Sequence, residues 1–448
     1  MQGFRSHYPF LASGTVMTLS PRGGCLAGSS PSKPLFVAPF TAASLTHLDG
    51  TSTLDEVLSR AYREAATEEE LLCLTAELAA LFRGGLLAFE PEPQCAPTTI
   101  KGSFDVFYPE NLQVELTAAC NLRCSYCYRD ALYGREPERL TTDALLGILA
   151  ALHERGLRSV ELTGGEPFMH PEFARIVEFC AARFHLIGLL TNGSLVTERS
   201  VQPMLPHTAK FVVSVSLDSH RAEVHDRRRG MQGAFARTVN GIRLLAASGF
   251  LTRVSMSVDE ENWPDIEETL LLARSLGAFA FAYAPILPFG RGKQGFRMWQ
   301  ATAVDVVEQE KALQQKYRGF LDLLNENTIE KLHQPGGCGA GHRVYAMDPC
   351  GNVRPCVTFA TDEAIAGNLA RESPEQVFGG ELARRFAGLL APDAASCGDC
   401  RWAFFCRNCV YRATVASEWI GREHCTWLGQ EPQRQWLDAV ERRSTATR

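Results

Sequence analysis

The sequence predicts an α/β protein built around a partial (β/α)6 barrel of the TIM type. Six short apolar runs alternate with amphipathic helical patterns over Asn111–Glu326, which favours parallel strands joined by crossover helices. Before this region, short strand patterns followed by three helical patterns indicate a small winged-helix-like domain. A cysteine-rich stretch follows it. We therefore expect three domains, covering residues 1–98, 99–325 and 326–448.

Periodicity assigns the elements of the barrel region, because alternation of period two indicates strands and a period near 3.6 indicates helices. The expected strands are Gln113–Thr117, Ser159–Thr163, Leu186–Thr191, Phe211–Leu217, Arg253–Val258 and Phe279–Ala284, and the expected helices are Thr142–Glu154, Pro171–Ala182, Gly233–Ala247 and Asp265–Leu276.

Fifteen cysteines are the anomaly in an otherwise ordinary composition. Of the 448 residues, 45% are hydrophobic and 21% are charged, and a net charge of −6 gives no general attraction to nucleic acid or to an anionic membrane. The sequence shows no secretory signal and no apolar stretch long enough to span a bilayer, so we expect a cytoplasmic protein. In a reducing compartment, abundant cysteine indicates metal binding rather than disulfides.

Three closely spaced cysteines carry the strongest chemical signal. Cys120, Cys124 and Cys127 lie in the run Glu115-Leu-Thr-Ala-Ala-Cys-Asn-Leu-Arg-Cys-Ser-Tyr-Cys-Tyr128. Three thiolates can hold three corners of a cubane iron–sulfur cluster, and because no fourth cysteine is near, one iron stays open for a substrate or cofactor. A structural zinc site is the alternative, but such sites typically close with four ligands from two paired sets.

Further unusual residues stand where the expected strands end. These are Gly164-Gly-Glu-Pro167, Thr191-Asn-Gly193 and Ser216-Leu-Asp218. Barrel folds carry their active sites at the carboxyl ends of the strands. Each motif alone would fit a plain turn or a helix cap, but their shared position after successive strands indicates one site. Asp218 is also a candidate general base at the barrel mouth, as are Asp226 and Tyr283.

The cysteine spacing, with the aromatic Tyr126 just before the last cysteine, resembles the radical S-adenosylmethionine (SAM) enzymes. This resemblance implies a [4Fe-4S] cluster held by the three cysteines. It also implies that the loop Gly164–Pro167 binds the amino group of SAM, with Glu166 adding a nearby charge. When bound, these cofactors would supply a 5′-deoxyadenosyl radical that removes a hydrogen atom from an unreactive carbon.

A second stretch resembles the peptide-modifying members of the same family. It contains Ser216-Leu-Asp218, His225-Asp226 and Arg229-Gly230, and the resemblance implies that Ser216 contacts the SAM ribose and Arg229 its carboxylate. The run carries one extra residue and also offers Arg227 and Arg228. The complete set of implied SAM-binding residues is Tyr126, Gly164, Gly165, Glu166, Pro167, Asn192, Ser216 and Arg229.

The C-terminal cysteines resemble the SPASM extension, which binds two auxiliary clusters in peptide maturases. Paired cysteines such as Cys397-x-x-Cys400 would also fit a small zinc knuckle, but seven or eight thiolates exceed one zinc site. The resemblance implies one ligand set of Cys338, Cys356 and Cys409, and a second set of Cys397, Cys400, Cys406 and Cys425.

Two features depart from this pattern. Arg407-Asn408 supply two residues between the last paired cysteines, where the family usually has three. Cys350 precedes Gly351 at a position where relatives commonly carry an aspartate. Cys350 either completes the first auxiliary cluster or is a bystander, in which case an open iron there is available to a substrate thiolate.

The N-terminal region is expected to dock a peptide. Strands Val16–Leu19 and Pro34–Ala38 precede helices Ala42–Leu48, Leu54–Glu64 and Glu68–Arg83. A winged helix often reads DNA, but residues 41–90 carry nine acidic residues and three arginines, a balance of −6 that opposes phosphate binding.

Two short segments of this region resemble the element that docks leader peptides of ribosomally made natural products. They are Leu48–Glu56 and Gly85–Phe89. Such elements pair an extended peptide with the edge of a sheet. Pro91–Pro97 is then expected to link this element to the barrel.

Together these features predict a radical SAM peptide maturase with three [4Fe-4S] clusters, one of which binds SAM. We expect it to install an oxidative thioether or carbon–carbon cross-link in a leader-bearing precursor peptide, using an electron donor such as flavodoxin or ferredoxin. A formylglycine-type sulfatase maturase and a non-catalytic peptide-binding scaffold are the alternatives. The first would not need the N-terminal element, and the second would have no use for SAM.

Overall fold

The computed structural model divides the chain into two compact units. The first is Met1–Tyr108 with Glu154–Gly156, and the second is Pro109–His153 with Leu157–Arg448. In the part of the chain that is described, no helix is long and apolar enough to cross a membrane. The domain limits suggested by the sequence stay predictions. The described residues are 2–28, 34–65, 67–129, 131–133, 139–287, 290–292, 303–321, 339–359, 364–398, 400, 402–406 and 409–446.

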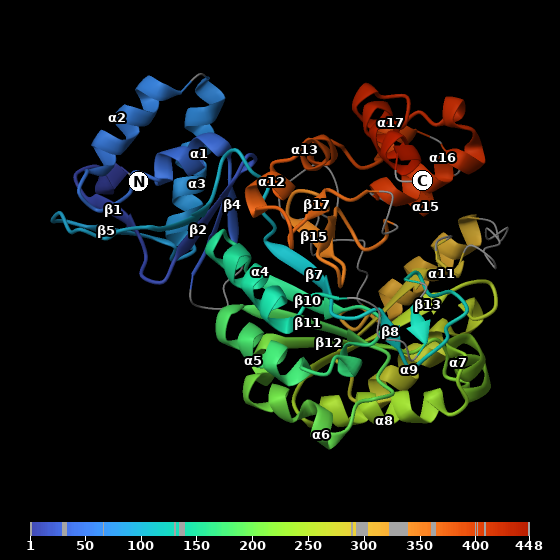
Figure 1. Cartoon of the computed structure of the whole chain (residues 1–448). Helices are drawn as coiled ribbons and strands as arrows, with labels where there is room; N and C mark the ends of the chain where they lie inside the picture. The colour runs from blue at the N-terminus through green and yellow to red at the C-terminus, as the bar shows by residue number, and fades with distance from the viewer. Residues whose placement is uncertain are drawn as a thin grey trace. The chain divides into compact units, whose positions relative to one another are not determined.

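The first unit combines two small sheets with three helices (Figure 1). The larger sheet has the strand order β4-β3-β2-β6, and β1 pairs with β5 in a separate two-stranded sheet. The bounds are η1 (Gln2–Phe4), β1 (Tyr8–Leu11), β2 (Val16–Ser20), β3 (Gly23–Ala27), β4 (Leu35–Val37), α1 (Pro39–Leu45), α2 (Leu54–Glu64), α3 (Glu68–Arg83), β5 (Leu87–Glu90) and β6 (Thr99–Gly102).

Local signals explain why the helices of this unit begin where they do. Both α2 and α3 start with a capping box, in which Thr53 pairs with Glu56 and Thr67 pairs with Glu70. These two helices have the predicted bounds, whereas α1 begins three residues earlier than expected because Pro39 suits the first turn of a helix. The apolar faces of the helices and of β2 and β3 form one buried core.

The second unit contains a nine-stranded sheet with the order β14-β13-β12-β11-β10-β7-β15-β16-β17. Strands β7 and β10 to β14 are all parallel, as in a partial barrel. The bounds are β7 (Asn111–Glu115), β8 (Ala119–Cys120), β9 (Leu132–Tyr133), α4 (Thr142–Glu154), β10 (Ser159–Thr163), η2 (Pro167–Met169), α5 (Phe173–Arg183), β11 (Leu186–Thr191), α6 (Glu198–Val201), η3 (Gln202–Lys210), β12 (Phe211–Ser216), α7 (Ala222–Arg229), α8 (Ala234–Ala247), β13 (Leu251–Val258), η4 (Trp263–Asp265), α9 (Ile266–Ser275), β14 (Ala280–Pro285) and α11 (Ala303–Lys316).

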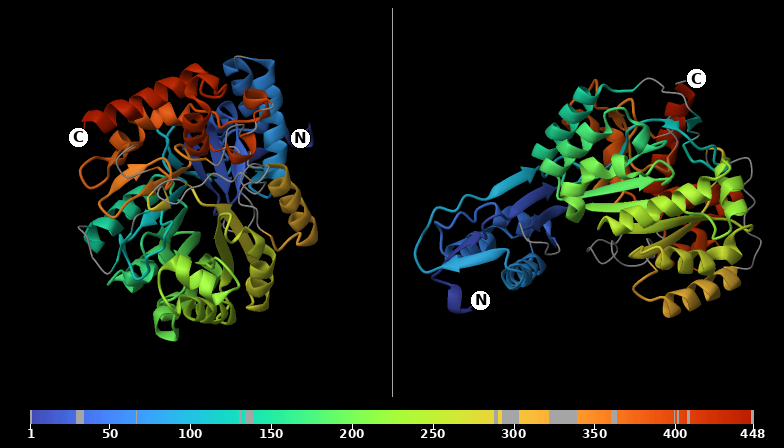
Figure 2. Two further views of the ribbon diagram at one scale, coloured as in Figure 1. Left: turned by 90° about the vertical axis from the view of Figure 1, so that its right-hand side faces the viewer. Right: turned by 90° about the horizontal axis from the view of Figure 1, so that it is seen from below.

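The two faces of this sheet differ in chemistry. Along β13 every second residue from Thr252 to Val258 is buried, and the residues between them are half-buried. The buried face is apolar and is covered by α4, α5, α8 and α9, which lie along one side of the strands (Figures 1 and 2). All six predicted barrel strands are present, each within two residues of its expected bounds. The carboxyl ends of these strands therefore meet at one edge, as expected.

The cysteine-rich segment extends the same sheet. Strand β15 pairs with β7 in parallel, and β16 and β17 follow antiparallel. The helices beyond them pack around Trp427 and Trp436, each 1% exposed. The bounds are β15 (Val344–Met347), β16 (Asn352–Arg354), β17 (Gly367–Asn368), α12 (Pro374–Phe378), α13 (Glu381–Ala387), α14 (Ala394–Cys397), α15 (Ala403–Cys406), α16 (Val410–Ile420), η5 (Arg422–His424) and α17 (Glu431–Ala446).

Candidate active site

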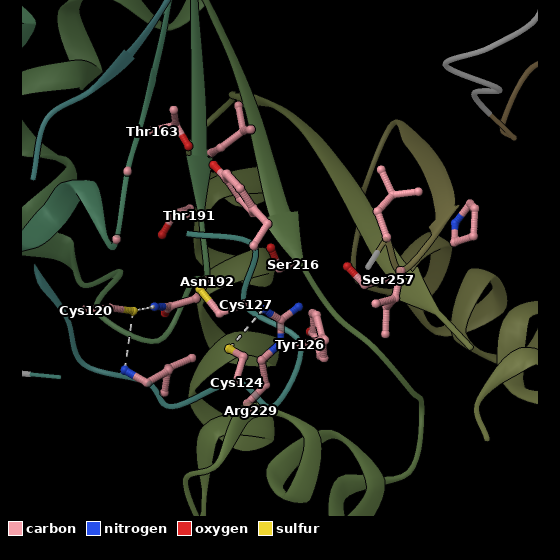
Figure 3. A pocket seen from close by; sticks show the side chains of 18 residues that line it. Cys120, Cys124, Tyr126, Cys127, Thr163, Thr191, Asn192, Ser216, Arg229 and Ser257 are labelled. Carbon is pink, nitrogen blue, oxygen red and sulfur yellow. Dashed lines mark hydrogen bonds between the residues drawn. The ribbon is translucent and has the colours of Figure 1, made fainter. Parts of the chain in front are cut away.

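The three clustered cysteines lie beside one cavity of about 270 Å³ at the carboxyl ends of the barrel strands (Figure 3). Cys120 ends β8 and is 7% exposed, Cys124 is 8% exposed, and Cys127 is half-buried. None of the described cysteines forms a disulfide. Burial is the main cause that raises the pKa of the Cys120 thiol to about 12. A thiolate at this site therefore needs a cation such as iron beside it.

Backbone bonds to a neighbouring helix shape the loop that carries these cysteines. The Arg123 N–H donates to the Arg229 carbonyl at 3.0 Å, and the Ser125 N–H donates to the Arg228 carbonyl at 3.1 Å. Helix α7 then ends at Gly230 with a φ of 66°, where a Cβ would lie 2.5 Å from the Arg123 carbonyl oxygen. Only glycine combines this left-handed backbone with such a close approach.

Arg291 holds the other side of the same loop. Its Nε donates to the Cys124 carbonyl at 2.8 Å and its Nη1 to the Ala131 carbonyl at 3.1 Å, while its main-chain N–H donates to the Cys127 carbonyl at 3.0 Å. Gly290 permits this contact, because a Cβ there would lie 2.3 Å from the Cys127 carbonyl oxygen. Sequence reasoning missed Arg291, and the Gly-Arg-Gly run around it was the available signal.

Hydrogen-bond donors point at two of the sulfurs. The Leu122 N–H lies 3.4 Å from Cys120 Sγ, and Asn192 Nδ2 lies 3.9 Å from the same sulfur. Arg229 Nη1 lies 3.8 Å from Cys124 Sγ, on the opposite side of the loop (Figure 3). Donors to cysteine sulfur stabilise thiolates and tune the potential of a cluster that they hold.

The Gly164-Gly165 pair lies against the segment that leads into Cys120. The Gly165 N–H donates to the Thr117 carbonyl at 2.7 Å, and the Glu166 N–H donates to the Ala119 carbonyl at 2.9 Å. A Cβ on Gly164 would lie 2.4 Å from Thr117 O, and one on Gly165 would lie 2.0 Å from Ala119 O. The glycines are therefore needed for this close approach of two backbones.

Glu166 is fully buried beside the cavity. Its carboxylate accepts hydrogen bonds from the Thr191 hydroxyl at 2.7 Å, the Asn192 N–H at 2.9 Å and the Phe168 N–H at 3.3 Å. Burial raises its pKa to about 7, although these donors act in the opposite direction. The residue holds the ends of β10 and β11 together, and neither Glu166 nor Pro167 lines the cavity.

Arg229 lies in a buried network with Asp218. Arg229 Nη2 donates to Asp218 Oδ1 at 2.9 Å, its Nε lies 2.9 Å from Oδ2, and the Tyr126 hydroxyl donates to the same carboxylate. Burial alone would raise the pKa of Asp218, but Arg229 and Arg228 outweigh it and lower that pKa. Asp218 is therefore an ionised partner of Arg229 rather than a free base.

The three neighbouring arginines of α7 have different surroundings. Arg227 is exposed and pairs with Glu261, and Arg228 is buried against Asp259 at 2.7 Å. Arg229 alone of the three lines the cavity. The helical turn thus separates three side chains that the sequence presents as equivalent.

The other candidate bases do not reach the cavity either. The Asp226 carboxylate accepts from the N–H groups of Gly233 at 2.6 Å and Phe235 at 2.7 Å, at the start of α8. Tyr283 of β14 is paired in register with Met256 of β13, and its ring packs edge-on against Trp263. Among the described residues that line the cavity, none of these three candidate bases is present.

Most of the predicted SAM-binding residues do line the cavity. Thr163, Thr191 and Ser257 add further polar groups to its wall, and Tyr128 and Leu287 add apolar ones. The predicted residues on its wall are Cys120, Cys124, Cys127, Tyr126, Gly164, Gly165, Asn192, Ser216 and Arg229.

Five of the C-terminal cysteines interact electrostatically. Burial raises the pKa of Cys406 to about 12, and the nearby thiolates of the other four raise it further. Within the described residues, no three potential ligand side chains converge on a single metal ion. A cubane cluster binds each thiolate to a different iron, so it does not require such convergence. The five are Cys397, Cys400, Cys406, Cys409 and Cys425.

The remaining candidate ligands differ in their surroundings. Cys356 is half-buried against the C-terminal core, and Thr358 Oγ1 donates to its sulfur at 3.3 Å. Cys350 is exposed in the turn between β15 and β16, where Asp348 accepts its N–H at 2.9 Å. Cys338 lies outside the described residues, as do Arg407 and Asn408.

Comparison with known proteins decides the family. The model of the radical SAM superfamily matches residues 114–273. The chain is 30% identical over 350 residues to the antilisterial bacteriocin subtilosin biosynthesis protein AlbA of Bacillus subtilis, covering 74% of each chain. The chain belongs to the radical SAM peptide maturases. SAM and a [4Fe-4S] cluster are accordingly its cofactors, and the buried thiols with their sulfur-directed donors fit such a cluster.

A further relative agrees with this assignment, and a solved structure agrees with the fold. The mycofactocin maturase MftC of Mycobacterium tuberculosis is 31% identical over 308 residues, which cover 67% of this chain and 78% of MftC. Among solved structures, Streptococcus suis SuiB bound to precursor peptide SuiA matches with a TM-score of 0.61 and 13% identity. That match covers 87% of this chain and 92% of SuiB, and it supports the fold.

Proposed function

We propose that this radical SAM maturase installs an oxidative thioether or carbon–carbon cross-link in a ribosomally synthesised precursor peptide. The observation that carries the proposal is the shared cavity, where two buried thiols and the half-buried Cys127 meet a glycine loop, Asn192, Ser216 and Arg229. SuiB is described as binding a precursor peptide, and MftC is named a maturase. We propose that this chain also acts on a precursor peptide.

In this proposal Cys120, Cys124 and Cys127 hold the radical SAM cluster and leave one iron for SAM. When bound, these cofactors supply a 5′-deoxyadenosyl radical that abstracts one hydrogen atom from the peptide. The Gly164-Gly165 backbone orients the amino end of SAM. Ser216, at the end of β12, contacts the SAM ribose. Arg229 supplies positive charge on the same wall, held in place by Asp218.

An oxidative cross-link removes two hydrogen atoms from the peptide. The second leaves as a proton and an electron, for which the C-terminal cysteines would hold two acceptor clusters. We assign Cys338, Cys356 and Cys409 to one cluster, with Cys350 as the candidate for its fourth ligand. We assign the second to Cys397, Cys400, Cys406 and Cys425, and the electrostatic interaction of Cys406 with the other three supports this assignment.

We also propose that the first unit docks the leader of the peptide on β4. This strand is at one edge of its sheet and pairs with β3 alone among the described strands. The Glu77 carboxylate of α3 accepts the Ala38 N–H at 3.1 Å, so this helix flanks the end of β4. Peptides that add a strand to a sheet pair with its edge through main-chain hydrogen bonds.

Hydrogen–deuterium exchange tests the docking site. Added precursor peptide should protect the amides of β4 and α3, while β6 at the other edge of the same sheet serves as an internal control. Protection of β6 without β4 would place the peptide elsewhere.

An anaerobic assay tests the reaction. The protein with reconstituted clusters is incubated with SAM, dithionite and the small peptide encoded beside its gene, and the intact peptide mass is recorded. A loss of about two hydrogens per event together with 5′-deoxyadenosine supports the proposal. Oxidation of one cysteine or serine without a bridge would support the formylglycine-type alternative. If the protein contains all of its clusters but forms no 5′-deoxyadenosine, the result would support the non-catalytic scaffold alternative.

A further inference from the structure

A buried triad of charges joins three segments of the second unit. Glu115 Oε2 lies 2.8 Å from Arg129 Nη1 and 2.9 Å from Arg354 Nη2. The three side chains are 0%, 7% and 1% exposed, in the order Glu115, Arg129 and Arg354. One carboxylate oxygen therefore receives two guanidinium groups from distant parts of the chain.

This triad is a poor device for stability alone. Removing a charge from water has a large free-energy cost, and a protein in which apolar residues of similar volume replace a buried ion pair is often equally stable. Three polar atoms of the triad also find no hydrogen-bond partner among the described residues, namely Glu115 Oε1, Arg129 Nε and Arg354 Nε. A network with this desolvation cost calls for another explanation, and its location supplies one.

Each member of the triad belongs to a segment that carries a proposed cluster ligand. Glu115 ends β7 and leads into Cys120, and Arg129 follows Cys127 by two residues. Arg354 precedes Cys356 by two residues, and its Nη1 donates to the Phe359 carbonyl at 2.6 Å. The Phe359 N–H in turn donates to the Cys356 carbonyl at 3.3 Å. The Arg354 side chain thus closes the turn around Cys356.

Tyr128 lies where the two regions meet. It lines the cavity beside Cys127 and also packs against the C-terminal hydrophobic core, to which Cys356 belongs. The cavity wall, the triad and the Cys356 turn are therefore in mutual contact through adjacent residues.

We propose that Glu115, Arg129 and Arg354 are positioning residues that hold the Cys356 turn at a fixed place relative to the Cys127 loop. This inference rests on the proposed function, because it concerns the transfer of one electron from the peptide radical to a C-terminal cluster, with loss of one proton from the peptide. If the turn is displaced, the peptide radical takes up one electron from dithionite and one proton from solvent instead, and no bridge forms.

The test uses Arg354→Met in the full-length enzyme with reconstituted clusters. We expect the amount of 5′-deoxyadenosine formed per bridge to rise, by up to about a hundredfold for a displacement near 1 Å. In deuterated buffer the unbridged peptide should gain one deuterium. The electron paramagnetic resonance spectrum of the dithionite-reduced enzyme, recorded without SAM or peptide, should also change in its auxiliary signals.

Two further variants separate the outcomes. Glu115→Gln keeps the shape of the side chain and should raise the same ratio of 5′-deoxyadenosine to bridge. It takes the place of Arg354→Met in the test if that variant is too unstable to purify. Arg343→Met is the matched control, because Arg343 pairs with Glu110 at 2.9 Å near the opposite ends of β7 and β15. It should leave the ratio and the spectrum unchanged.

The inference is overturned if the wild type forms the bridge while Glu115→Gln and Arg354→Met keep the wild-type ratio of 5′-deoxyadenosine to bridge and the wild-type spectrum. Selective loss of iron from the C-terminal cysteines in these variants would support it. A wild type that forms 5′-deoxyadenosine and no bridge with the peptide would instead reject the proposed function.

Discussion

Replacing Gly165 by alanine tests whether the glycine loop must touch the segment before Cys120. The φ of Gly165 is not in the left-handed region, so the backbone itself accepts alanine. The obstacle is the neighbouring chain, because the new Cβ would lie 2.0 Å from the Ala119 carbonyl oxygen. Carbon and oxygen normally approach to about 3.3 Å, so the two segments must separate by about 1.3 Å.

That separation breaks both hydrogen bonds between the segments. They measure 2.7 Å from Gly165 N to Thr117 O and 2.9 Å from Glu166 N to Ala119 O, and both would exceed about 3.5 Å. Each such bond contributes about 0.5–1.5 kcal/mol to the free energy of unfolding, so the variant should lose about 1–3 kcal/mol. Since Ala119 precedes Cys120, the first thiol should move as well.

Urea denaturation, iron content and SAM binding of the anaerobically purified protein measure these effects. The matched control is Gly147→Ala on the exposed face of α4, where a Cβ meets nothing within 4 Å. It should gain up to about 1 kcal/mol from helix propensity. If Gly165→Ala keeps wild-type stability, iron and SAM affinity, the close approach of the two backbones is not needed and the reasoning fails.

Three further variants follow from the same contacts. In the wild type the buried Glu166 has a pKa of about 7 and keeps a proton that the unfolded chain releases near pH 4.5, so the wild type loses stability as pH rises through this window. Glu166→Gln does not titrate and should therefore gain up to about 3 kcal/mol of stability relative to wild type over the same pH range. Urea midpoints at pH 5 and 8 measure this, and a constant difference would contradict it. Asp218→Asn should cost about 3 kcal/mol by leaving Arg229 buried without its counter-charge, and an unchanged melting temperature would count against that pairing. Arg291→Lys should destabilise the cysteine loop by about 2 kcal/mol and speed loss of iron to a chelator, since lysine cannot reach both carbonyls; equal rates would exclude the clamp.

The sequence predicted the elements that depend on local patterns. The predicted bounds are exact for several elements, because alternation and capping boxes act over a few residues. These elements include Ser159–Thr163, Leu186–Thr191, Leu54–Glu64 and Glu68–Arg83. The strand Gly23–Ala27 was missed because all five of its residues are buried and no alternation marks it. The spacing of the first three cysteines also lies within one loop, so the sequence alone indicated their shared site.

Roles that depend on distant partners required the tertiary structure. From sequence, Asp218 is a candidate base and three consecutive arginines are equivalent. The fold instead buries Asp218 against Arg229, which alone of the three lines the cavity. Glu166 likewise accepts hydrogen bonds from Thr191 and Asn192 and does not line the cavity.

The sequence by itself determined the cofactor chemistry, because the ligand spacing is local. The tertiary structure decided which charges surround that chemistry, because their partners lie far apart in the chain. Arg354 and Glu115 are 239 residues apart and meet only because β15 pairs with β7 in parallel and brings β16 beside it. No periodicity or motif encodes such a contact, since it depends on strand order, which the hydrophobic pattern of each separate strand leaves open.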